Sequence, residues 1–183
     1  MRTMRWLETG RCCVSLVQRI NNVTGNFYSD EWYTDQQTVE LCISLLNPKP
    51  QSVVLCPFDS EKSLFVKELK ERGFVVLYGM QNFLTQQYHA DYIMTNPPFS
   101  IKDAVIQRIY EMGIPSLLLL PIDSLGGVKR HAMYQEHGHP SVYIPSKRIK
   151  YYNDNWELQN GVAFHSIISL FNTGKPSEII WER

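Results

Sequence analysis

The stretch Asp91-Tyr92-Ile93-Met94-Thr95-Asn96-Pro97-Pro98-Phe99-Ser100 decides how this 183-residue chain is interpreted. Its apolar first half is typical of a buried strand, and Ser100 is a favoured residue at a helix N-cap. Residues 96–99 are therefore predicted to form a loop between a strand and a helix. Ligands of α/β sheets bind at the carboxyl ends of the strands, where such loops lie. The two prolines fix two φ angles and remove two N–H donors, which makes the loop stiff.

This loop has the chemistry to bind an amino group on a flat ring. The side-chain oxygen of Asn96 and the carbonyl oxygen of Pro97 can both accept hydrogen bonds from one NH2 group, and Phe99 offers a flat face. Two such acceptors stabilise positive charge that develops on an amine nitrogen when it attacks an electrophile. We assign Asn96, Pro97, Pro98 and Phe99 as catalytic candidates. The alternative is an ordinary turn, which Asn-Pro sequences often form.

Length and composition exclude several classes of protein. A chain of 183 residues suggests one domain, which can bury about 70% of its unfolded surface. Lys plus Arg and Asp plus Glu both number 18, so a protein that coats nucleic acid is not expected, although a local basic face remains open. No apolar run is long enough to span a membrane. The four cysteines form no Cys-x-x-Cys pair, which favours a reduced, cytoplasmic protein.

A metal site is not expected. His137 and His139 lie close together, but no third ligand stands at a suitable spacing, so this segment is interpreted as a surface loop.

The chain is divided into a short extension and one larger domain. Residues 1–28 form a basic N-terminal extension with four arginines and one glutamate, interpreted either as a poorly ordered terminus or as an arm that binds nucleic acid. Residues 29–183 form the predicted catalytic domain.

Apolar runs alternate with helical patterns in the larger domain. Strands are predicted at residues 52–56, 74–78, 91–95, 116–120, 141–144, 165–171 and 178–181. The first predicted helix is capped by Thr34 or Asp35, and the second is capped by Asp59 or Ser60 and ends at Gly73. A third helix covers residues 100–112, with Ala104, Val105, Ile109 and Met112 facing inward. This order predicts an α/β fold with a mostly parallel, twisted sheet, to which late strands are added antiparallel at the edge.

Taken in order, these residues resemble the class I S-adenosylmethionine-dependent amino-methyltransferases. The Asn-Pro-Pro-Phe motif, the segment 30–34 and the Cys-Pro-Phe-Asp sequence at 56–59 resemble in particular small Dam-like N6-adenine methyltransferases of phages and prophages. The resemblance covers about residues 30–171. It implies a Rossmann-like class I methyltransferase fold and S-adenosylmethionine as cofactor. It also implies cofactor contacts from Tyr33, Thr34, Cys56, Pro57, Phe58, Asp59, Asn82 and Phe83.

The resemblance further implies methyl transfer to the N6 amino group of adenine, in DNA in preference to RNA. The base would be extruded from its stack to reach the loop at 96–99. Because the same motif suits other amine acceptors, an RNA base or a glutamine amide of a protein remains an alternative.

The chain departs from the family pattern in two places. The loop at 56–61 contains no glycine, although glycine usually lets the backbone approach the cofactor closely. The second strand ends in Tyr78 and Gly79 instead of an acid that would bind the ribose. Asp59 could bind the cofactor's amino group, and Glu61 the ribose, or both could cap a helix. Because of these departures, an alternative remains: the chain is a binding protein that has the methyltransferase fold but does not catalyse methyl transfer.

A basic and aromatic segment is the candidate nucleic-acid contact. Cations and aromatic rings together can bind phosphates and stack on bases. The candidates are Lys147, Arg148, Lys150, Tyr151 and Tyr152. The alternative is a solvated loop with two packing tyrosines. The nearby segment 126–130 is either a substrate loop or an ordinary turn.

Overall fold

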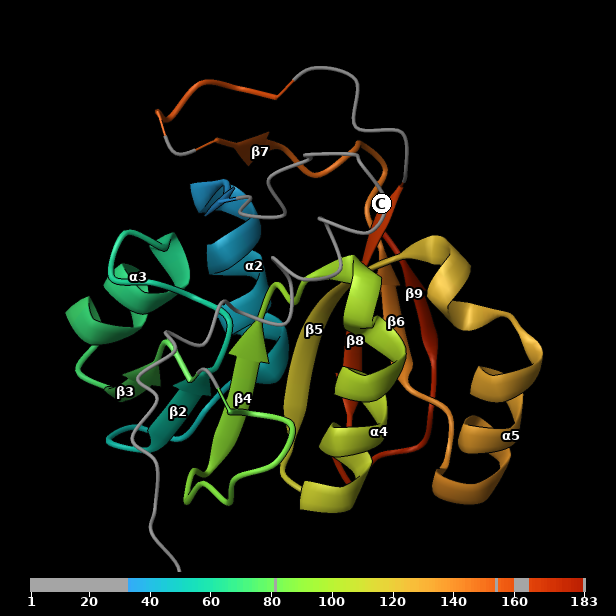
Figure 1. The fold of residues 1–183 in the computed structure, drawn as a ribbon. Coiled ribbons are helices and arrows are strands. Elements are labelled where there is room, and N and C mark those ends of the chain that lie inside the picture. The colour runs from blue at the N-terminus through green and yellow to red at the C-terminus, as the bar shows by residue number, and fades with distance from the viewer. Residues whose placement is uncertain (1–32, 81, 154, 160–164, 183) are drawn as a thin grey trace, which may run out of the picture.

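The computed structural model describes residues 33–80, 82–153, 155–159 and 165–182. The predicted N-terminal extension, residues 1–28, lies outside these ranges. The described residues form one central sheet with helices on both faces and a second, two-stranded sheet beside it (Figure 1).

The central sheet has the strand order β3-β2-β4-β5-β8-β6-β9. Its strands are β2 (Val53–Cys56), β3 (Val75–Tyr78), β4 (Tyr92–Thr95), β5 (Ser116–Pro121), β6 (Ser141–Ile144), β8 (Ser166–Phe171) and β9 (Ile179–Trp181). The small sheet pairs β1 (Tyr33–Thr34) with β7 (Tyr151–Tyr152). The helices are α2 (Gln36–Leu46), α3 (Leu64–Glu71), α4 (Lys102–Met112) and α5 (Val128–His137), with short 3-10 helices η1 (Phe99–Ile101) and η2 (Ile122–Leu125).

The predicted α/β class and the mostly parallel sheet are confirmed. Strands β2, β3, β4 and β5 pair in parallel, and β8 is antiparallel to both β5 and β6. The predicted position of the antiparallel strand at the sheet edge is wrong, because β8 lies inside the sheet and β9 forms the edge, parallel to β6. Every residue of β8 is buried, as expected for a strand that is covered on both faces.

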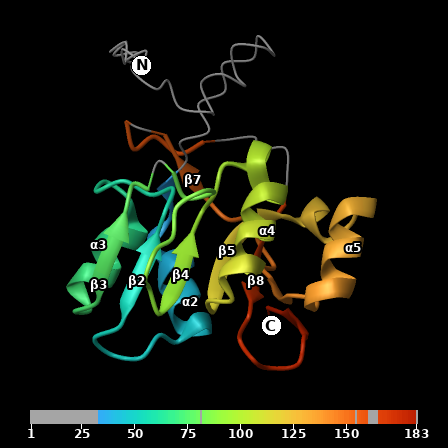
Figure 2. The ribbon, with the colours of Figure 1, turned by 60° about the horizontal axis from the view of Figure 1, so that its bottom comes forward.

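Helices α2 and α3 cover one face of the sheet and α4 covers the other (Figure 2), and the two larger clusters of buried apolar side chains lie on these two faces. Alternate residues of a strand point to opposite faces, so Val54 and Cys56 pack with helices α2 and α3, whereas Leu55 packs with α4. Burial of these apolar side chains on both faces fixes the sheet as a rigid central layer. The loops at the carboxyl ends of β2, β3 and β4 are therefore held at one edge of it.

Of the three predicted N-caps of helices, the structure confirms one and corrects two. Asp35 caps α2 as predicted, because its carboxylate accepts a 3.1 Å hydrogen bond from the Thr38 amide. The prediction that Asp59 or Ser60 caps the second helix is wrong, since α3 begins at Leu64 and its N-cap is Ser63. Ser100 is not the cap of the third helix either. The 3-10 helix η1 follows Pro98, so α4 begins only at Lys102.

The inward face of α4 also differs from the prediction in one position. Val105 and Ile109 are buried as predicted, but Ala104 is exposed. Ile106 and Arg108 are buried instead. The charged side chain of Arg108 therefore lies on the buried face of α4.

The segment at 126–130 forms an ordered turn and the first turn of α5. Gly127 has a φ of 102°, a left-handed conformation that glycine adopts without strain. Arg130 donates hydrogen bonds to the carbonyl oxygens of Gly126 (2.6 Å) and Asp123 (3.0 Å) and forms a 2.6 Å ion pair with Asp103. Helix α5 was not predicted. In it only Tyr134 is buried, so the sequence has no apolar stripe to indicate a helix.

Candidate functional site

The loop after β2, residues 57–63 and here called the β2 loop, contacts the other candidate segments. Asp59 accepts a 2.7 Å hydrogen bond from Ser63 Oγ within this loop and a 2.6 Å bond from Thr95 Oγ1 at the end of β4. Because Thr95 directly precedes Asn96, this bond connects the cofactor candidate Asp59 to the candidate catalytic loop, residues 96–99 and here called the catalytic loop. The observed role of Asp59 is to join two loops, whereas the sequence suggested a helix cap.

The environment of Asp59 favours its protonated form. Burial raises the pKa of this carboxyl to about 6, and the hydrogen bonds from Thr95 and Ser63 oppose that shift. A protonated Asp59 has one fewer lone pair for these two hydroxyl donors but carries a proton of its own. The connection between Asp59 and Thr95 is therefore expected to change with pH around the pKa of this carboxyl, about 6.

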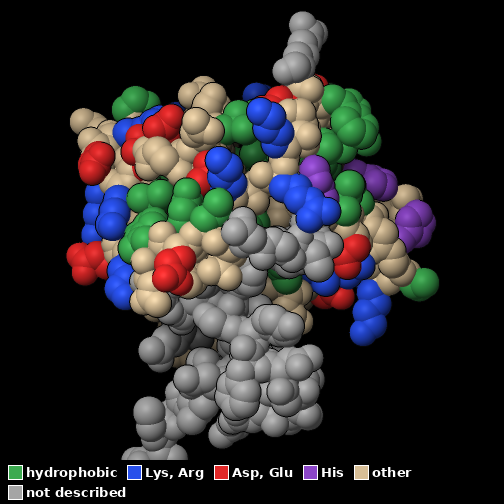
Figure 3. Space-filling model, turned by 90° about the horizontal axis from the view of Figure 1, so that it is seen from above, with side chains coloured by type: hydrophobic (Ala, Val, Ile, Leu, Met, Phe, Trp, Pro, Cys, Tyr) green, Lys and Arg blue, Asp and Glu red, His purple; other side chains and the backbone are tan. Residues whose placement is uncertain are grey.

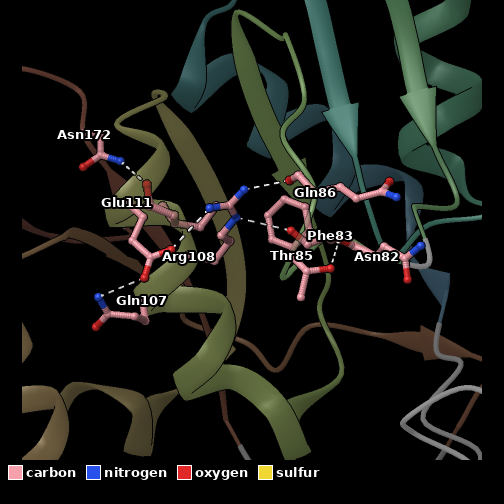
Figure 4. Close-up of polar contacts among 9 residues, drawn as sticks. Asn82, Phe83, Thr85, Gln86, Gln107, Arg108, Glu111 and Asn172 are labelled. Atoms are coloured by element: carbon pink, nitrogen blue, oxygen red, sulfur yellow. Dashed lines mark hydrogen bonds and ion pairs between the residues drawn. The ribbon is translucent and has the colours of Figure 1, made fainter. Parts of the chain in front are cut away.

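The loop after β3, residues 79–80 and 82–90 and here called the β3 loop, lies against the β2 loop. The Met80 amide donates a 2.8 Å hydrogen bond to the Pro57 carbonyl, and the Phe58 and Phe83 rings meet edge to face at 5.4 Å. Phe83 is buried, while its neighbour Asn82 is exposed (Figure 4). The cofactor candidates on the two loops thus form one cluster. In it the Phe58 ring packs on the buried Phe83 ring, and the Asn82 amide is exposed beside them.

The small sheet brings the remaining candidates to the β2 loop. Tyr33 pairs with Tyr152 and Thr34 with Tyr151, so cofactor and nucleic-acid candidates lie on paired strands. The Tyr33 hydroxyl lies 3.4 Å from Ser60 Oγ in the β2 loop. The Tyr33 ring also stacks on Trp156 at 5.3 Å between ring centroids. Strands β1 and β7 and the Trp156 side chain are therefore anchored beside the β2 loop.

The catalytic candidates lie at the carboxyl end of β4, as the sequence predicts for a loop after a buried strand. Pro97 is buried, whereas Asn96, Pro98 and Phe99 are partly exposed. The Oδ1 oxygen of Asn96 itself is enclosed by protein atoms. Phe99 begins η1, so the motif leads directly into the helical segment that covers one face of the sheet.

The basic segment before and within β7 alternates between surface and core. Lys147, Arg148 and Lys150 are exposed, and the view onto this edge of the sheet shows basic side chains interspersed with apolar ones (Figure 3). Tyr151 is buried in the core, and its hydroxyl lies 2.8 Å from Ser166 Oγ. Burial raises the pKa of that hydroxyl. Of the two tyrosines, Tyr152 is the one with a partly exposed ring.

The departures from the family pattern have visible structural consequences. Cys56 is buried in the core, where burial raises the pKa of its thiol, so its side chain belongs to the protein interior and not to the exposed part of the cluster. At the end of β3, Lys70 Nζ lies 4.4 Å from the centre of the Tyr78 ring and 3.3 Å from its hydroxyl. Tyr78 thus contacts α3 instead of replacing the missing acid. Gly79 follows with a φ of 71°.

Several residues of the cluster were missed by sequence reasoning. Thr95 is a polar residue at the end of an otherwise apolar strand, which was a usable signal for a specific contact. Arg108 stands at the position between Val105 and Ile109 that completes an inward stripe, so a charge there was a second signal. No local pattern indicates the stacking of Trp156 on Tyr33, which are 123 positions apart in the sequence.

Within the described ranges, no group of three or more His, Cys, Asp or Glu side chains is arranged to hold a metal ion. The helices in these ranges also lack the length and apolar character needed to cross a bilayer.

Comparison with known proteins identifies the fold. No protein-family model matches the chain, and no curated protein matches it significantly. The structure resembles the M protein of the type I restriction enzyme EcoKI, with a TM-score of 0.52, 14% identity, and coverage of 84% of this chain and 47% of that one. A modification subunit of a putative type I restriction enzyme from Vibrio vulnificus gives a TM-score of 0.51, 14% identity and coverages of 88% and 48%.

A putative RNA methyltransferase from Pyrococcus horikoshii is less similar, with a TM-score of 0.48, 12% identity and coverages of 86% and 98%. The chain spans about half the length of the two restriction-enzyme subunits. At these identities the comparison establishes the fold alone, a Rossmann-like class I methyltransferase fold.

Proposed function

We propose that this protein transfers a methyl group from S-adenosylmethionine to the N6 amino group of adenine, in DNA in preference to RNA. The observation that carries the proposal is the position of Asn96-Pro97-Pro98-Phe99 at the carboxyl end of β4, joined through Thr95 to the β2 loop. In sheets of this kind, ligands bind outside the carboxyl ends of the strands, at the point where the strand order reverses. The order β3-β2-β4-β5 reverses between β2 and β4.

The residues at this point fit a nucleoside-containing cofactor. Thr34 Oγ1 is buried and has no hydrogen-bond partner among the described residues, so a polar group of a ligand would satisfy it. The partly exposed Phe58 provides an apolar ring that is supported from below by the buried Phe83, and the exposed Asn82 amide offers both a donor and an acceptor. These residues, with the backbone of the β2 loop, would hold S-adenosylmethionine, which when bound supplies a methyl group on a positively charged sulfur.

The catalytic loop would act on the acceptor base. The exocyclic nitrogen of adenine is a poor nucleophile because its lone pair is delocalised into the ring. Asn96 Oδ1 and the Pro97 carbonyl would accept hydrogen bonds from its two N–H groups and stabilise the positive charge that develops on the nitrogen. Phe99 would stack on the base. The proton can leave late, when the nitrogen is cationic and acidic, so a dedicated base with a shifted pKa is not needed.

The exposed basic residues would bind the nucleic acid. Lys147, Arg148 and Lys150 can contact phosphates, and Tyr152 can stack on a base that has been extruded toward the catalytic loop. DNA is the first acceptor to test because the two most similar folds reported above belong to modification subunits of restriction enzymes.

The test has two stages. Calorimetric titration of the full chain with S-adenosylmethionine should show saturable binding. Incubation with cofactor that carries a tritiated methyl group should then label DNA more strongly than RNA or protein. Label in RNA or in protein glutamine would keep the chemistry and replace the acceptor.

A second candidate function is a binding protein without catalysis. The absence of glycine from the β2 loop and the contact of Tyr78 with Lys70, where an acid is usual, favour it. No heat of binding at millimolar S-adenosylmethionine would exclude methyl transfer and leave this second function.

A further inference from the structure

Arg108 is a buried arginine in α4 that contacts the β3 loop (Figure 4). Its Nε donates a 3.3 Å hydrogen bond to the Phe83 carbonyl, and its Nη2 donates a 2.7 Å bond to the Gln86 carbonyl. The third nitrogen, Nη1, lies 3.3 Å from the carboxylate of Glu111, one turn further along the same helix. The Arg108 guanidinium therefore binds two backbone oxygens of the β3 loop and pairs with the carboxylate of Glu111.

The two carbonyls that Arg108 binds belong to a compact turn. Within it, the amides of Thr85 and Gln86 both donate 2.9 Å hydrogen bonds to the Asn82 carbonyl. The turn is thus closed on itself, and its Phe83 and Gln86 oxygens are directed toward α4. The rigid, planar fork of an arginine can bind both oxygens at once, whereas a lysine ammonium is a single point of contact.

This contact fixes the residues at the border of the candidate cofactor site. Phe83 meets Phe58 of the β2 loop edge to face, and Asn82 is its exposed neighbour. Because Arg108 holds the backbone of Phe83, it sets where both side chains lie relative to the β2 loop. The short helix η1 joins the catalytic loop to α4, so α4 contacts the β3 loop and is also continuous with the catalytic loop.

A purely stabilising role would not require an arginine here. Position 108 completes the inward stripe of Val105, Ile109 and Met112, where an apolar side chain would pack without the cost of removing a charge from water. The pair with Glu111 does not offset this cost in full, because the Glu111 side chain is half exposed, where an ion pair contributes little. What the arginine adds is a defined position for the loop.

We propose that Arg108 is a positioning residue for the nucleoside end of S-adenosylmethionine, acting through the backbone of Phe83 and Gln86. The inference rests on the proposed function. It predicts that loss of Arg108 weakens binding of the cofactor while leaving the chemistry of the catalytic loop intact.

The test compares Arg108→Met and Arg108→Lys with the wild-type chain. Arg108→Met should raise the Kd and the KM for S-adenosylmethionine roughly 10–100-fold. This is the range seen at metal sites when a residue that orients a metal-binding side chain is lost. The Kd for 5′-methylthioadenosine, which lacks the amino-acid end, should rise by the same factor. The kcat at saturating cofactor should stay close to that of the wild type, and Arg108→Lys should lie in between.

Arg72→Met is the matched control, because Arg72 at the end of α3 also pairs with a glutamate one turn away, but its side chain is exposed and its printed bond is to Glu68 and not to the β3 loop. It should leave both Kd values unchanged. Unfolding in urea gives the folded fraction of each variant. A lower stability of Arg108→Met with an unchanged Kd per folded molecule would show a structural role only and overturn the inference, as would a loss of kcat with an unchanged KM.

If Arg108→Met does not fold, Arg108→Lys decides the question, and a wild-type Kd in that variant overturns the inference. Failure of the proposed function is a different result. In that case the wild-type chain itself would not bind S-adenosylmethionine.

Discussion

Thr95 Oγ1 donates a 2.6 Å hydrogen bond to Asp59 Oδ2, which joins the last residue of β4 to the loop that follows β2. The two strands are neighbours in the sheet, with Val54 opposite Tyr92 and Leu55 opposite Ile93. The bond extends this connection beyond the backbone ladder. Since the next residue is Asn96, the β2 loop helps to set the point at which the catalytic loop begins.

Replacement of Thr95 by valine should destabilise the protein. Thr95 is fully buried, and valine has nearly its shape but no hydroxyl, so the Asp59 carboxyl would lose a partner in a buried place. We expect the free energy of unfolding to fall by about 1 kcal/mol, the usual net contribution of one hydrogen bond, because Asp59 is partly buried and keeps its bond from Ser63. Urea unfolding followed by circular dichroism measures it.

Thr95→Ser is the control, because serine keeps the hydroxyl and loses one methyl group. It should lie closer to the wild type than Thr95→Val does. Equal stability of Thr95→Val and the wild type would mean that the bond contributes nothing to the fold.

The stability of the protein should depend on the protonation of Asp59. Burial raises the pKa of its carboxyl from 3.8 to about 6. Between these two values the folded protein keeps a proton that the unfolded chain has released. The contribution of Asp59 to the free energy of unfolding is therefore fully present below about pH 4 and is lost as the pH rises through about 6.

Urea unfolding of the wild type and of Asp59→Asn between pH 4 and pH 7 isolates this contribution. Asparagine does not titrate, so groups common to both proteins cancel in the difference. The stability of the wild type relative to the variant should decrease as the pH rises. A difference that is flat, or that grows with pH, would contradict a raised pKa of Asp59.

The sequence predicts those parts of this fold that depend on local apolar patterns. Buried runs such as residues 116–120 indicate central strands because both faces must be apolar, and the stiff loop after Thr95 follows from its prolines. Helix α5 and the small sheet were missed for the opposite reason. Helix α5 buries only Tyr134, and β1 and β7 are two residues long and are held together across the chain.

The sequence predicts the part of the candidate site that consists of one continuous motif. It does not predict contacts between residues that are far apart in the chain. Asp59 stands in a loop before a helix, where an N-cap is the usual role, but Ser63 takes that role. The carboxylate is then available for Thr95, 36 positions later in the chain. Contacts across such separations are set by the order of strands in the sheet, which local propensity does not encode.

The stack of Trp156 on Tyr33 should hold the small sheet closed. Trp156 adopts a φ of 59°, an uncommon conformation for this residue, and Lys67 Nζ lies 5.3 Å from the centre of its ring. An aromatic pair contributes about 0.5–1.5 kcal/mol beyond the area that it buries. Trp156→Ala should therefore speed local opening of the small sheet up to roughly tenfold.

Hydrogen exchange of the Asp35 amide, which donates a 3.2 Å bond to the Lys150 carbonyl beside the small sheet, reports this opening. Trp181→Ala is the matched control, since Trp181 is exposed on β9 at the edge of the central sheet. It should leave that exchange rate unchanged. If the Asp35 amide exchanges at the same rate in both variants, the stack of Trp156 on Tyr33 does not hold the small sheet closed.

Replacement of Asn96 by alanine separates the catalytic loop from the cofactor site. If Asn96 Oδ1 stabilises the charge on the acceptor nitrogen, its loss should lower turnover roughly 10²–10³-fold, as loss of one preorganised hydrogen-bond group does elsewhere. The Kd for S-adenosylmethionine should change little, because the cofactor candidates lie on β1, at the end of β2, and in the β2 and β3 loops. Tritium transfer to nucleic acid and calorimetric titration measure the two quantities.

Asn155→Ala serves as the control for Asn96→Ala, because Asn155 is exposed and its recorded hydrogen bond comes from the backbone amide. Both turnover and cofactor affinity should then match the wild type. Near-normal turnover in Asn96→Ala would remove this residue from the mechanism. A parallel loss of cofactor affinity would instead mean that Asn96 shapes the binding site, since a group that acts only on the developing charge lowers turnover without weakening the bound state that precedes it.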